Sequence, residues 1–305
     1  MHAFHTIREY KNSQPHPVRR EGGLRTRGKF YKSSQDAQLV SVITIVKNSE
    51  HTLERTVQSV LSQSYNRIEY IIIDGASTDR TLDILSRYDD HITYWLSEPD
   101  KGISDAFNKG IAVSTGDFIC LLNADDWLSR EQIEQSVHAL QNSSADYVFG
   151  DLLFHDENGR ILYRINGDPD YRKIIHSKMS ISHPTVLARR QAYERVGLFD
   201  TRYDYAMDYE WLLRLHTQGG TGMHVKEIIG HMGIGGVSES SYRKTLKEVR
   251  DIAVSYGQQR WLANCLYIFR IIKGALRRFL EDHAPKRLYH VLRKKINRKY
   301  TSQIQ

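Results

Sequence analysis

The chain has 305 residues, a formal net charge of +7 and two cysteines. Its length allows one large domain or two smaller ones with an ample core, and two cysteines exclude a disulfide framework and a cysteine-rich zinc site. No apolar run approaches the roughly 18 residues of a spanning helix, and the first residues lack the apolar core of a signal peptide. We therefore expect neither an integral membrane protein nor an exported one.

Positive charge is concentrated at the two ends of the chain. Residues 1–36 carry eight Lys/Arg against three Asp/Glu and residues 258–305 carry twelve against two, so the segment between them is acidic. A nucleic-acid-binding domain would carry its positive charge on the folded binding face. We expect no nucleic-acid partner, and we predict that residues 1–37 form a basic, mostly disordered extension.

Strands and helices alternate at short intervals after residue 38. Apolar runs, most of them rich in β-branched residues, predict four strands, at 40–46, 69–73, 92–96 and 118–122. Apolar residues at helical spacing predict helices between them, at 53–61, 82–85 and 102–112. This alternation indicates an α/β fold with a Rossmann-like, mostly parallel sheet flanked by helices and joined by right-handed crossovers.

The order of elements changes after residue 128. The pattern predicts a helix over 133–140 and a hairpin of strands at 147–154 and 161–165. A strand at 185–188, a short helix that ends at Gly197 and a helix over 207–215 follow. We place these elements on the far side of the same sheet, where they would face a second substrate.

The chain after residue 240 is predicted to be a basic, amphipathic helical region. A helix over 258–280 carries apolar and basic residues on separate stripes: Leu262, Cys265, Phe269, Ile272, Leu276 and Phe279 against Arg270, Lys273 and Arg277. Residues 286–299 repeat the pattern. The pattern favours binding to an anionic membrane surface. The alternative is a helical lid packed on the domain, with its cations solvated.

A short acidic motif follows the strand at 118–122. Asn123, Asp125 and Asp126 emerge at its carboxyl end, which is where ligands bind in an open α/β sheet. Two adjacent carboxylates repel unless a cation joins them, and oxygen ligands suit Mg²⁺ or Mn²⁺ held against a diphosphate. The alternative is a turn with a helix cap, because Asn and Asp bond their own backbone.

Five segments in order make the chain resemble a family 2 glycosyltransferase of the GT-A fold, over about residues 40–235. They are VITIVKN at 42–48, IDGASTD at 73–79, KGISDAFNKG at 101–110, NADD at 123–126 and MDYEW at 207–211. The resemblance implies a GT-A domain over 38–240. It also implies an inverting transfer of a sugar from a nucleoside-diphosphate sugar, with UDP favoured, to a glycan acceptor.

The resemblance implies a donor site at the ends of the first strands. Asp74 would accept the ring N–H of a uracil, and Thr44 and Asn48 would border the same base pocket. Glu50 would support that pocket, although a cap at a helix start is the alternative. Lys101 would reach the diphosphate as a point charge, and the alternative is a solvated loop lysine.

The segment Asn123-Ala124-Asp125 stands in for the family's Asp-x-Asp signature, with Asn at the first position. The substitution keeps an oxygen acceptor and makes Asp125 the expected metal ligand, for Mn²⁺ or Mg²⁺. Asp126 would assist or bind the sugar on the acceptor side. His231 is a further candidate for a metal or phosphate contact.

The second acid of the family's Glu-Asp pair matches Asp208, and Met207 replaces the Glu. Asp208 would be the general base that deprotonates the acceptor hydroxyl. The alternative is an acid favoured by the helix dipole. His183 would line the acceptor pocket or be structural, and core packing is the expected role of Trp211.

These features together predict a metal-dependent enzyme that is cytoplasmic and peripheral at the inner face of the plasma membrane. Its acceptor would be a polyprenyl-linked saccharide in cell-surface polysaccharide assembly. A sugar-phosphate nucleotidyltransferase is the nearest rival, but residues 46–49 lack the Gly-rich loop that cradles a triphosphate. A non-catalytic nucleotide-sugar-binding protein at the membrane surface is the other alternative.

Overall fold

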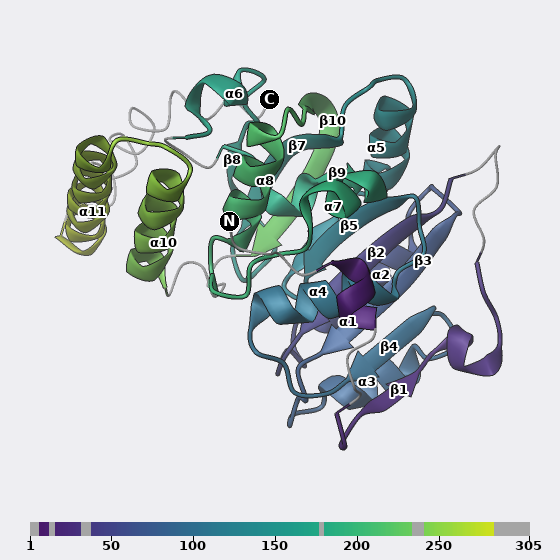
Figure 1. The fold of residues 1–305 in the computed structure, drawn as a ribbon. Coiled ribbons are helices and arrows are strands. Elements are labelled where there is room, and N and C mark those ends of the chain that lie inside the picture. Colours follow the sequence, from purple (N-terminus) through teal and green to yellow (C-terminus); the bar gives the residue numbers. More distant parts are fainter. Residues whose placement is uncertain (1–5, 12–15, 32–37, 177–179, 234–240, 284–305) are drawn as a thin grey trace.

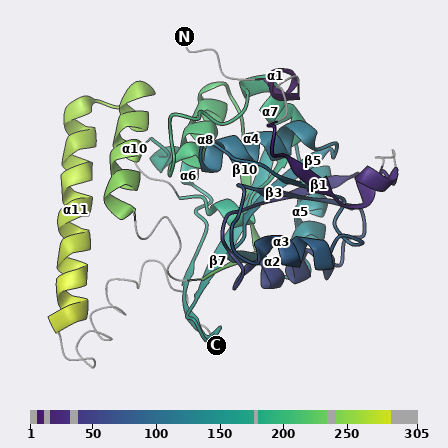
Figure 2. The same ribbon diagram turned by 90° about the horizontal axis from the view of Figure 1, so that it is seen from below.

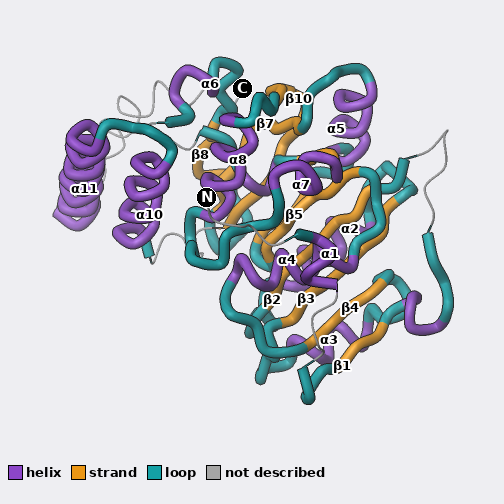
Figure 3. Tube along the Cα trace, viewed as in Figure 1, coloured by secondary structure: helices purple, strands orange, loops and turns teal. Residues whose placement is uncertain are grey.

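The protein folds around a ten-stranded sheet, shown in Figures 1 and 3. The computed structural model describes residues 6–11, 16–31, 38–176, 180–233 and 241–283. The strands are β1 (Arg20–Gly22), β2 (Val40–Val46), β3 (Ile68–Asp74), β4 (Tyr94–Ser97), β5 (Phe118–Asn123), β6 (Asp126–Leu128), β7 (Tyr147–His155), β8 (Ile161–Ile165), β9 (Leu187–Arg189) and β10 (Gly222–Gly233). They lie in the order β1-β4-β3-β2-β5-β9-β7-β10-β6, and β8 pairs with β7.

Four neighbouring strands, β4, β3, β2 and β5, run parallel. All seven residues of β2 are buried, because helices cover both faces of this part of the sheet. The α/β fold predicted from the alternating pattern is thereby confirmed. The strand predicted at 92–96 is β4, which begins at Tyr94. Ile92 lies before it, and its carbonyl accepts a hydrogen bond from the backbone N–H of Leu24.

Helices cover the two faces of the sheet in separate groups. Their bounds are α1 (Ile7–Lys11), α2 (Leu53–Leu61), α3 (Thr81–Arg87), α4 (Ile103–Val113), α5 (Gln132–Gln141), α6 (Tyr171–Ile174), α7 (Arg190–Val196), α8 (Met207–Thr217), α10 (Tyr242–Ser255) and α11 (Arg260–His283), with 3-10 turns η1 (Leu24–Arg27) and η2 (His183–Thr185). One core cluster joins α4, α7 and α8 to one face, and a second joins α2, α3 and α5 to the other. Amphipathic helices on both sides therefore bury the sheet.

The far half of the sheet contains the predicted hairpin and two strands that the sequence pattern did not predict. β7 and β8 pair antiparallel, as expected. β10 is twelve residues long and runs parallel to β7, with a register shift between His224 and Ile229. The sequence of β10 lacks a sustained alternation of apolar and polar residues, because few of its residues are buried. β6 is three residues long, too short to carry a pattern of its own.

The N-terminal residues that the structure describes do not form the predicted disordered extension. β1 pairs antiparallel with β4, and Arg25 of η1 places its guanidinium 2.5 Å from the carboxylate of Glu69. Glu69 is 1% exposed, and a buried carboxylate requires a counter-charge. The prediction of disorder is therefore wrong for residues 16–31. Residues 1–5, 12–15 and 32–37 lie outside the described residues.

The C-terminal helices stand at one side of the molecule. Figure 2 shows α10 between α11 and the rest of the fold. Val249 and Ile252 of α10 join the core, so α10 packs on the domain as the lid alternative expects. The apolar stripe of α11 instead stays exposed at Leu262, Cys265, Phe269, Ile272 and Leu276, as do the neighbouring Trp261 and Ile268. Among the described residues, no helix is long and apolar enough to cross a membrane; the segment 286–299 lies outside them.

Candidate active site

The register of the parallel strands brings four chain segments to one edge of the sheet. Val46 pairs with Asp74 and Asp74 pairs with Ser97, while Ile45 pairs with Asn123. The loops that follow β2, β3, β4 and β5 therefore open at the same edge. The chain places β3 and β4 on one side of β2 and β5 on the other. This reversal of strand order is where α/β sheets bind ligands.

Asp74, predicted to hold a uracil, lies at this edge but is fully buried. Its Oδ2 accepts hydrogen bonds from the hydroxyl of Ser97 at 2.6 Å and from the backbone N–H of Ser77 at 3.0 Å. Its Oδ1 accepts from the Ser77 hydroxyl. The carboxylate thus orders the loop that follows β3. The contact with a base stays a prediction, and it requires that some of these bonds be exchanged for the ligand.

Asn48 and Glu50 join the β2 loop to the β3 loop. Asn48 has a φ of 50°, a left-handed conformation that Asn tolerates better than most residues, and its side-chain oxygen accepts from the N–H of Thr78 at 2.8 Å. Glu50 accepts from the N–H of Arg80 at 2.9 Å. Their hydrogen bonds give both residues a structural role in shaping the site, whatever further contact they make with a donor.

Thr44 does not border the site. It lies in the middle of β2, is 0% exposed, and its hydroxyl is 3.2 Å from the hydroxyl of Tyr70. The prediction of a base-pocket role is wrong, because the side chain is enclosed in the core three residues before the loop begins.

The loop that carries Lys101 lies against the segment that precedes α8. Lys101 is exposed, and its backbone N–H donates to Asp105 Oδ2 at 3.1 Å. Asp105 also accepts from the hydroxyl of Tyr10 at 2.8 Å, so the N-terminal α1 buttresses the start of α4. Gly102 has a φ of +110°, and a Cβ there would lie 3.2 Å from Asp204 Oδ1. Two motifs that are a hundred residues apart in the sequence thereby meet.

The turn after β5 holds two adjacent carboxylates. Asn123 donates from its side-chain nitrogen to Asp126 Oδ2 at 3.1 Å, and the other Asp126 oxygen is buried without a hydrogen-bond partner. Burial raises the pKa of Asp125 and raises that of Asp126 well above its usual range, where the charge of Asp125 adds to the effect. Ala124 is buried, and its carbonyl accepts from Thr56 at 2.9 Å.

This arrangement fits a divalent cation at Asp125. Burial disfavours the ionised forms of Asp125 and Asp126, and Asp126 Oδ1 has no hydrogen-bond partner. A bound cation would stabilise both negative charges. The described residues contain no group of three or more His, Cys, Asp or Glu side chains that could hold a metal. The remaining ligands would then come from a diphosphate and water, as Mg²⁺ sites commonly use.

His231, predicted as a further metal or phosphate ligand, makes hydrogen bonds within the protein. Its Nε2 is 2.7 Å from the hydroxyl of Ser129 and its Nδ1 is 2.9 Å from Nε2 of His155, so both ring nitrogens are occupied. The ring stacks on Trp127 with 5.3 Å between centroids. Burial lowers the pKa of His231 to about 4. The contact with a metal or a phosphate stays a prediction, and it requires that one of these bonds be exchanged for the ligand; β10 pairs with β6 and places His231 opposite Trp127, next to the acidic turn.

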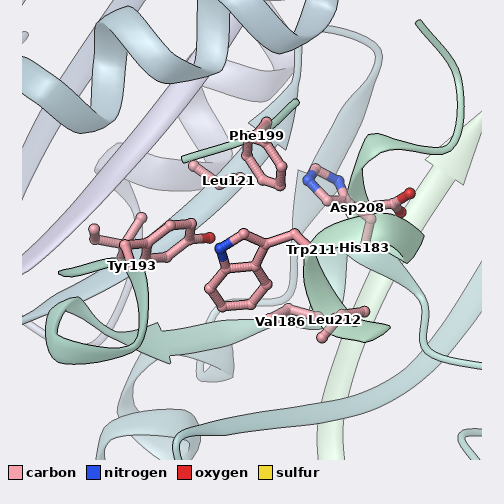
Figure 4. Close-up of a pocket in the computed structure, with 9 residues that line it drawn as sticks. Leu121, His183, Val186, Tyr193, Phe199, Asp208, Trp211 and Leu212 are labelled. Atoms are coloured by element: carbon pink, nitrogen blue, oxygen red, sulfur yellow. The ribbon is translucent and has the colours of Figure 1, made fainter. Parts of the chain in front are cut away.

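Asp208 lies in the first turn of α8 and lines a cavity whose other walls are largely apolar (Figure 4). Burial raises the pKa of Asp208 to about 6. The backbone N–H of Tyr209 donates a hydrogen bond to this carboxylate at 2.7 Å, which partly opposes the rise. His183 lines the same cavity; its Nε2 is buried without a hydrogen-bond partner, and burial lowers its pKa to about 4. Trp211 packs in the core as expected and donates to the Gly197 carbonyl at 3.1 Å.

The cavity and the acidic turn flank the same strand. Leu121, in the cavity wall, lies two residues before Asn123 in β5. Consecutive strand residues rise by about 3.3 Å each, so this part of the cavity wall lies roughly 7 Å along β5 from Asn123. The strand that leads into the acidic turn thus also forms part of the wall of the cavity that Asp208 lines.

Two residues of this region were missed in the sequence. Arg55 of α2 donates to the Asp125 carbonyl at 3.0 Å and places its guanidinium 3.7 Å from the Trp127 ring. Glu248 of α10 bonds the segment before Asp208. Neither residue lies in a recognisable motif, and the helical patterns that predicted their helices do not indicate which distant group each side chain contacts.

The fold and this site define a GT-A glycosyltransferase. The family model "Glycosyl transferase family 2" matches residues 41–197, just over half of the chain, and the protein belongs to this family. It is 37% identical over 186 residues to an uncharacterized glycosyltransferase of Mycobacterium tuberculosis strain H37Rv. The matched region covers 58% of this chain and 69% of that relative.

Solved structures share the fold. S. aureus TarS 1-349 in complex with UDP-GlcNAc superposes with a TM-score of 0.54 at 15% identity, over 75% of this chain and 70% of that one. The mannosyltransferase PcManGT from Pyrobaculum calidifontis, in complex with GDP-Man and Mn²⁺, gives a TM-score of 0.58 at 17% identity, over 89% and 84% of the two chains.

Proposed function

We propose that this glycosyltransferase moves a sugar from a nucleoside-diphosphate sugar, with UDP as the favoured nucleotide, to a hydroxyl of a glycan acceptor with inversion at the anomeric carbon. The observation that carries the proposal is Asp208: a carboxylate with a raised pKa that lines a cavity whose wall includes Leu121 of β5, the strand that leads into the turn of Asp125. The nucleotide sugars bound by TarS and PcManGT support the donor class.

Asp208 has the properties that a general base for this reaction needs. With a pKa of about 6 it is mostly ionised at neutral pH and still basic enough to accept a proton. The acceptor oxygen forms a bond to the anomeric carbon as its proton passes to the Asp208 carboxylate. The bond from that carbon to the diphosphate breaks, and the diphosphate leaves with the electron pair. No covalent enzyme intermediate is needed.

The turn after β5 supports the leaving diphosphate in this scheme. Asp125 would hold Mn²⁺ or Mg²⁺, with Asp126 close behind it, and a bound cation supplies charge neutralisation on the departing nucleoside diphosphate. Lys101, exposed at the same edge of the sheet, would add a point charge toward the diphosphate.

Removal of the metal tests this proposal. We expect hydrolysis or transfer of UDP sugars to stop in EDTA and to return with Mn²⁺. Asp125→Asn should raise the Mn²⁺ concentration for half-maximal activity by more than the roughly 10- to 100-fold that loss of an outer-shell partner causes. Asp90→Asn, an exposed carboxylate remote from the edge of the sheet, is the control and should leave that concentration unchanged.

Three results would contradict the proposal in different ways. Binding of UDP without any turnover would identify a nucleotide-sugar-binding protein. Release of pyrophosphate from a nucleoside triphosphate and a sugar phosphate would identify a nucleotidyltransferase. Full activity in EDTA would remove the metal from the scheme.

The proposal extends to a lipid-linked saccharide acceptor at an anionic membrane surface, in cell-surface polysaccharide synthesis on the cytoplasmic face. Its support is the exposed apolar stripe of α11, with Phe269 62% and Ile272 60% exposed, together with the excess of twelve Lys/Arg over two Asp/Glu in residues 258–305. An apolar face beside cations binds lipid through burial and through attraction to anionic headgroups.

Binding to lipid vesicles tests the proposed association with a membrane surface. Phe269→Glu should lower the partition of the protein onto phosphatidylglycerol vesicles by about tenfold or more, because a buried Phe contributes roughly 1.5–3 kcal/mol. Ile161→Glu, at a 44% exposed apolar residue of β8, is the matched control and should bind as the wild type does. Equal binding of all three proteins, or equal partition onto phosphatidylcholine, would contradict the membrane proposal.

A further inference from the structure

A carboxylate of α10 holds the chain segment that leads into the helix of Asp208. The side chain of Glu248 accepts three hydrogen bonds from consecutive backbone N–H groups. They come from Asp204 at 3.1 Å, Tyr205 at 2.9 Å and Ala206 at 2.8 Å. Three successive amides that point at one carboxylate fix the path of that segment, because each such bond to a charged group is stronger than a neutral one.

The GT-A domain itself contacts this segment from α4, where the Ser104 hydroxyl donates to the Tyr203 carbonyl at 2.6 Å. Ala206 is the residue before α8, and Asp208 is the second residue of the helix. The first N–H groups of a helix lack intrahelical partners, and here the partner for the entering segment comes from another part of the chain. Glu248 lies more than fifty residues beyond the stretch that matches the family model.

A second contact holds α10 along α8. The hydroxyl of Tyr256, directly after α10, donates to Glu210, and Glu210 pairs with Arg214 at 2.9 Å in the core. The two helices are therefore joined at the entrance to α8 and again near its first full turn. A shift of α10 would carry the start of α8 with it.

The charge of Glu248 also acts on Asp208. Burial is the main cause of the raised pKa of Asp208, and the nearby negative charge of Glu248 adds to it. The other titratable groups that face Asp208 are His183 and Tyr193, in the wall of the same cavity. His183, with a pKa lowered to about 4 by burial, is neutral at pH 7, and the Tyr193 hydroxyl is neutral because burial raises its pKa.

We infer that Glu248 is a positioning residue for the reaction: it sets the place of Asp208 by holding the three backbone amides that lead into α8. This inference rests on the proposed role of Asp208. It means that the C-terminal helices take part in the active site rather than serve only as an attachment to the domain.

Two substitutions of Glu248 distinguish its effect on the position of Asp208 from the effect of its negative charge. Glu248→Ala removes all three acceptor contacts, and we expect kcat to fall by about 10- to 100-fold, as for other misplacements of a catalytic group, with the donor KM unchanged. Glu248→Gln keeps an acceptor oxygen but no charge. We expect it to recover most of kcat and to move the acidic limb of the kcat/KM profile to lower pH, because the negative charge that raises the Asp208 pKa is gone.

Asp251→Asn is the matched control, since it removes one negative charge from the same helix at a residue whose hydrogen bonds go to Arg250. It should leave kcat and the pH profile unchanged. Wild-type kcat and pH profile in both Glu248 variants would overturn the inference, as would an equal shift in Asp251→Asn. A protein in which Asp208→Asn retains full turnover would instead overturn the proposed role of Asp208, which keeps the two failures distinct.

Discussion

Asp208→Asn is expected to lower kcat by about 10²- to 10⁴-fold, the usual contribution of a general base, while UDP-sugar binding measured by calorimetry stays at the wild-type value. The amide is nearly the same size as the carboxylate but cannot accept the proton of the acceptor hydroxyl. The substitution should not unfold the protein. The folded-state pKa of about 6 lies above the ordinary value of an aspartate, so the ionised carboxylate is disfavoured in the folded state at neutral pH. Its removal should therefore raise the free energy of unfolding there.

The wild-type pH profile gives the same residue a second test. A base must be ionised, so kcat/KM should fall as the pH falls through about 6 and should level off above it, because the pKa of Asp208 is raised to about 6. Asp90→Asn, at an exposed carboxylate outside the site, is the control for both measurements. An acidic limb near pH 4, or equal losses in the two variants, would point to another base.

Arg25→Met should lower the free energy of unfolding, measured with urea, by about 3 kcal/mol, because breaking a buried ion pair leaves an uncompensated charge inside the protein. Arg25 Nη2 lies 2.5 Å from Glu69 Oε1, and the Glu69 side chain is 1% exposed. Glu69 also accepts from the hydroxyls of Ser41 at 2.5 Å and Thr115 at 2.6 Å. These neutral donors cannot replace the guanidinium charge.

A control and a rescue variant distinguish this pair from ordinary surface ion pairs. Arg27→Met, in the same 3-10 turn, breaks exposed pairs with Asp89 and Asp90 and should change stability by less than about 1 kcal/mol. Glu69→Gln in the Arg25→Met background removes the stranded charge and should restore part of the loss, as a double-mutant cycle would measure. Equal effects of the two arginine substitutions would show that the N-terminal segment is not anchored by Glu69.

The parts of the site that local patterns predicted are those that lie directly after strands. The apolar run of β5 and the polar residues after it indicated both a buried strand and an acidic turn, because a parallel strand is buried on both faces and its polar residues begin where it ends. Asp208 was assigned through the resemblance of residues 207–211 to the family's Glu-Asp motif, and not through a local pattern. Thr44 was assigned wrongly, because a polar residue within an apolar run was taken for a member of the edge when it pairs with Tyr70 in the core.

What local patterns could not predict concerns partners that are distant in the sequence. His231 has the ligand chemistry of a metal site, but its two ring nitrogens bond Ser129 and His155, which are 102 and 76 residues away. The N-terminal segment has the composition of a disordered extension, yet it is ordered by a carboxylate in β3. Composition and periodicity report on neighbours within a few residues, and neither contains the identity of a contact across the fold.

The sequence by itself determined the class of fold, the family and the motifs at the ends of the strands, because hydrophobic periods and turn residues act over one element at a time. Only the tertiary structure decided which of the polar residues meet. It placed Glu248 on the amides before Asp208, Arg25 on Glu69, and the apolar stripe of α11 on the outside. A buried charge is stabilised by whichever group the packing brings within hydrogen-bonding distance, and that group is chosen by the arrangement of whole helices and strands rather than by the residues beside it in the chain.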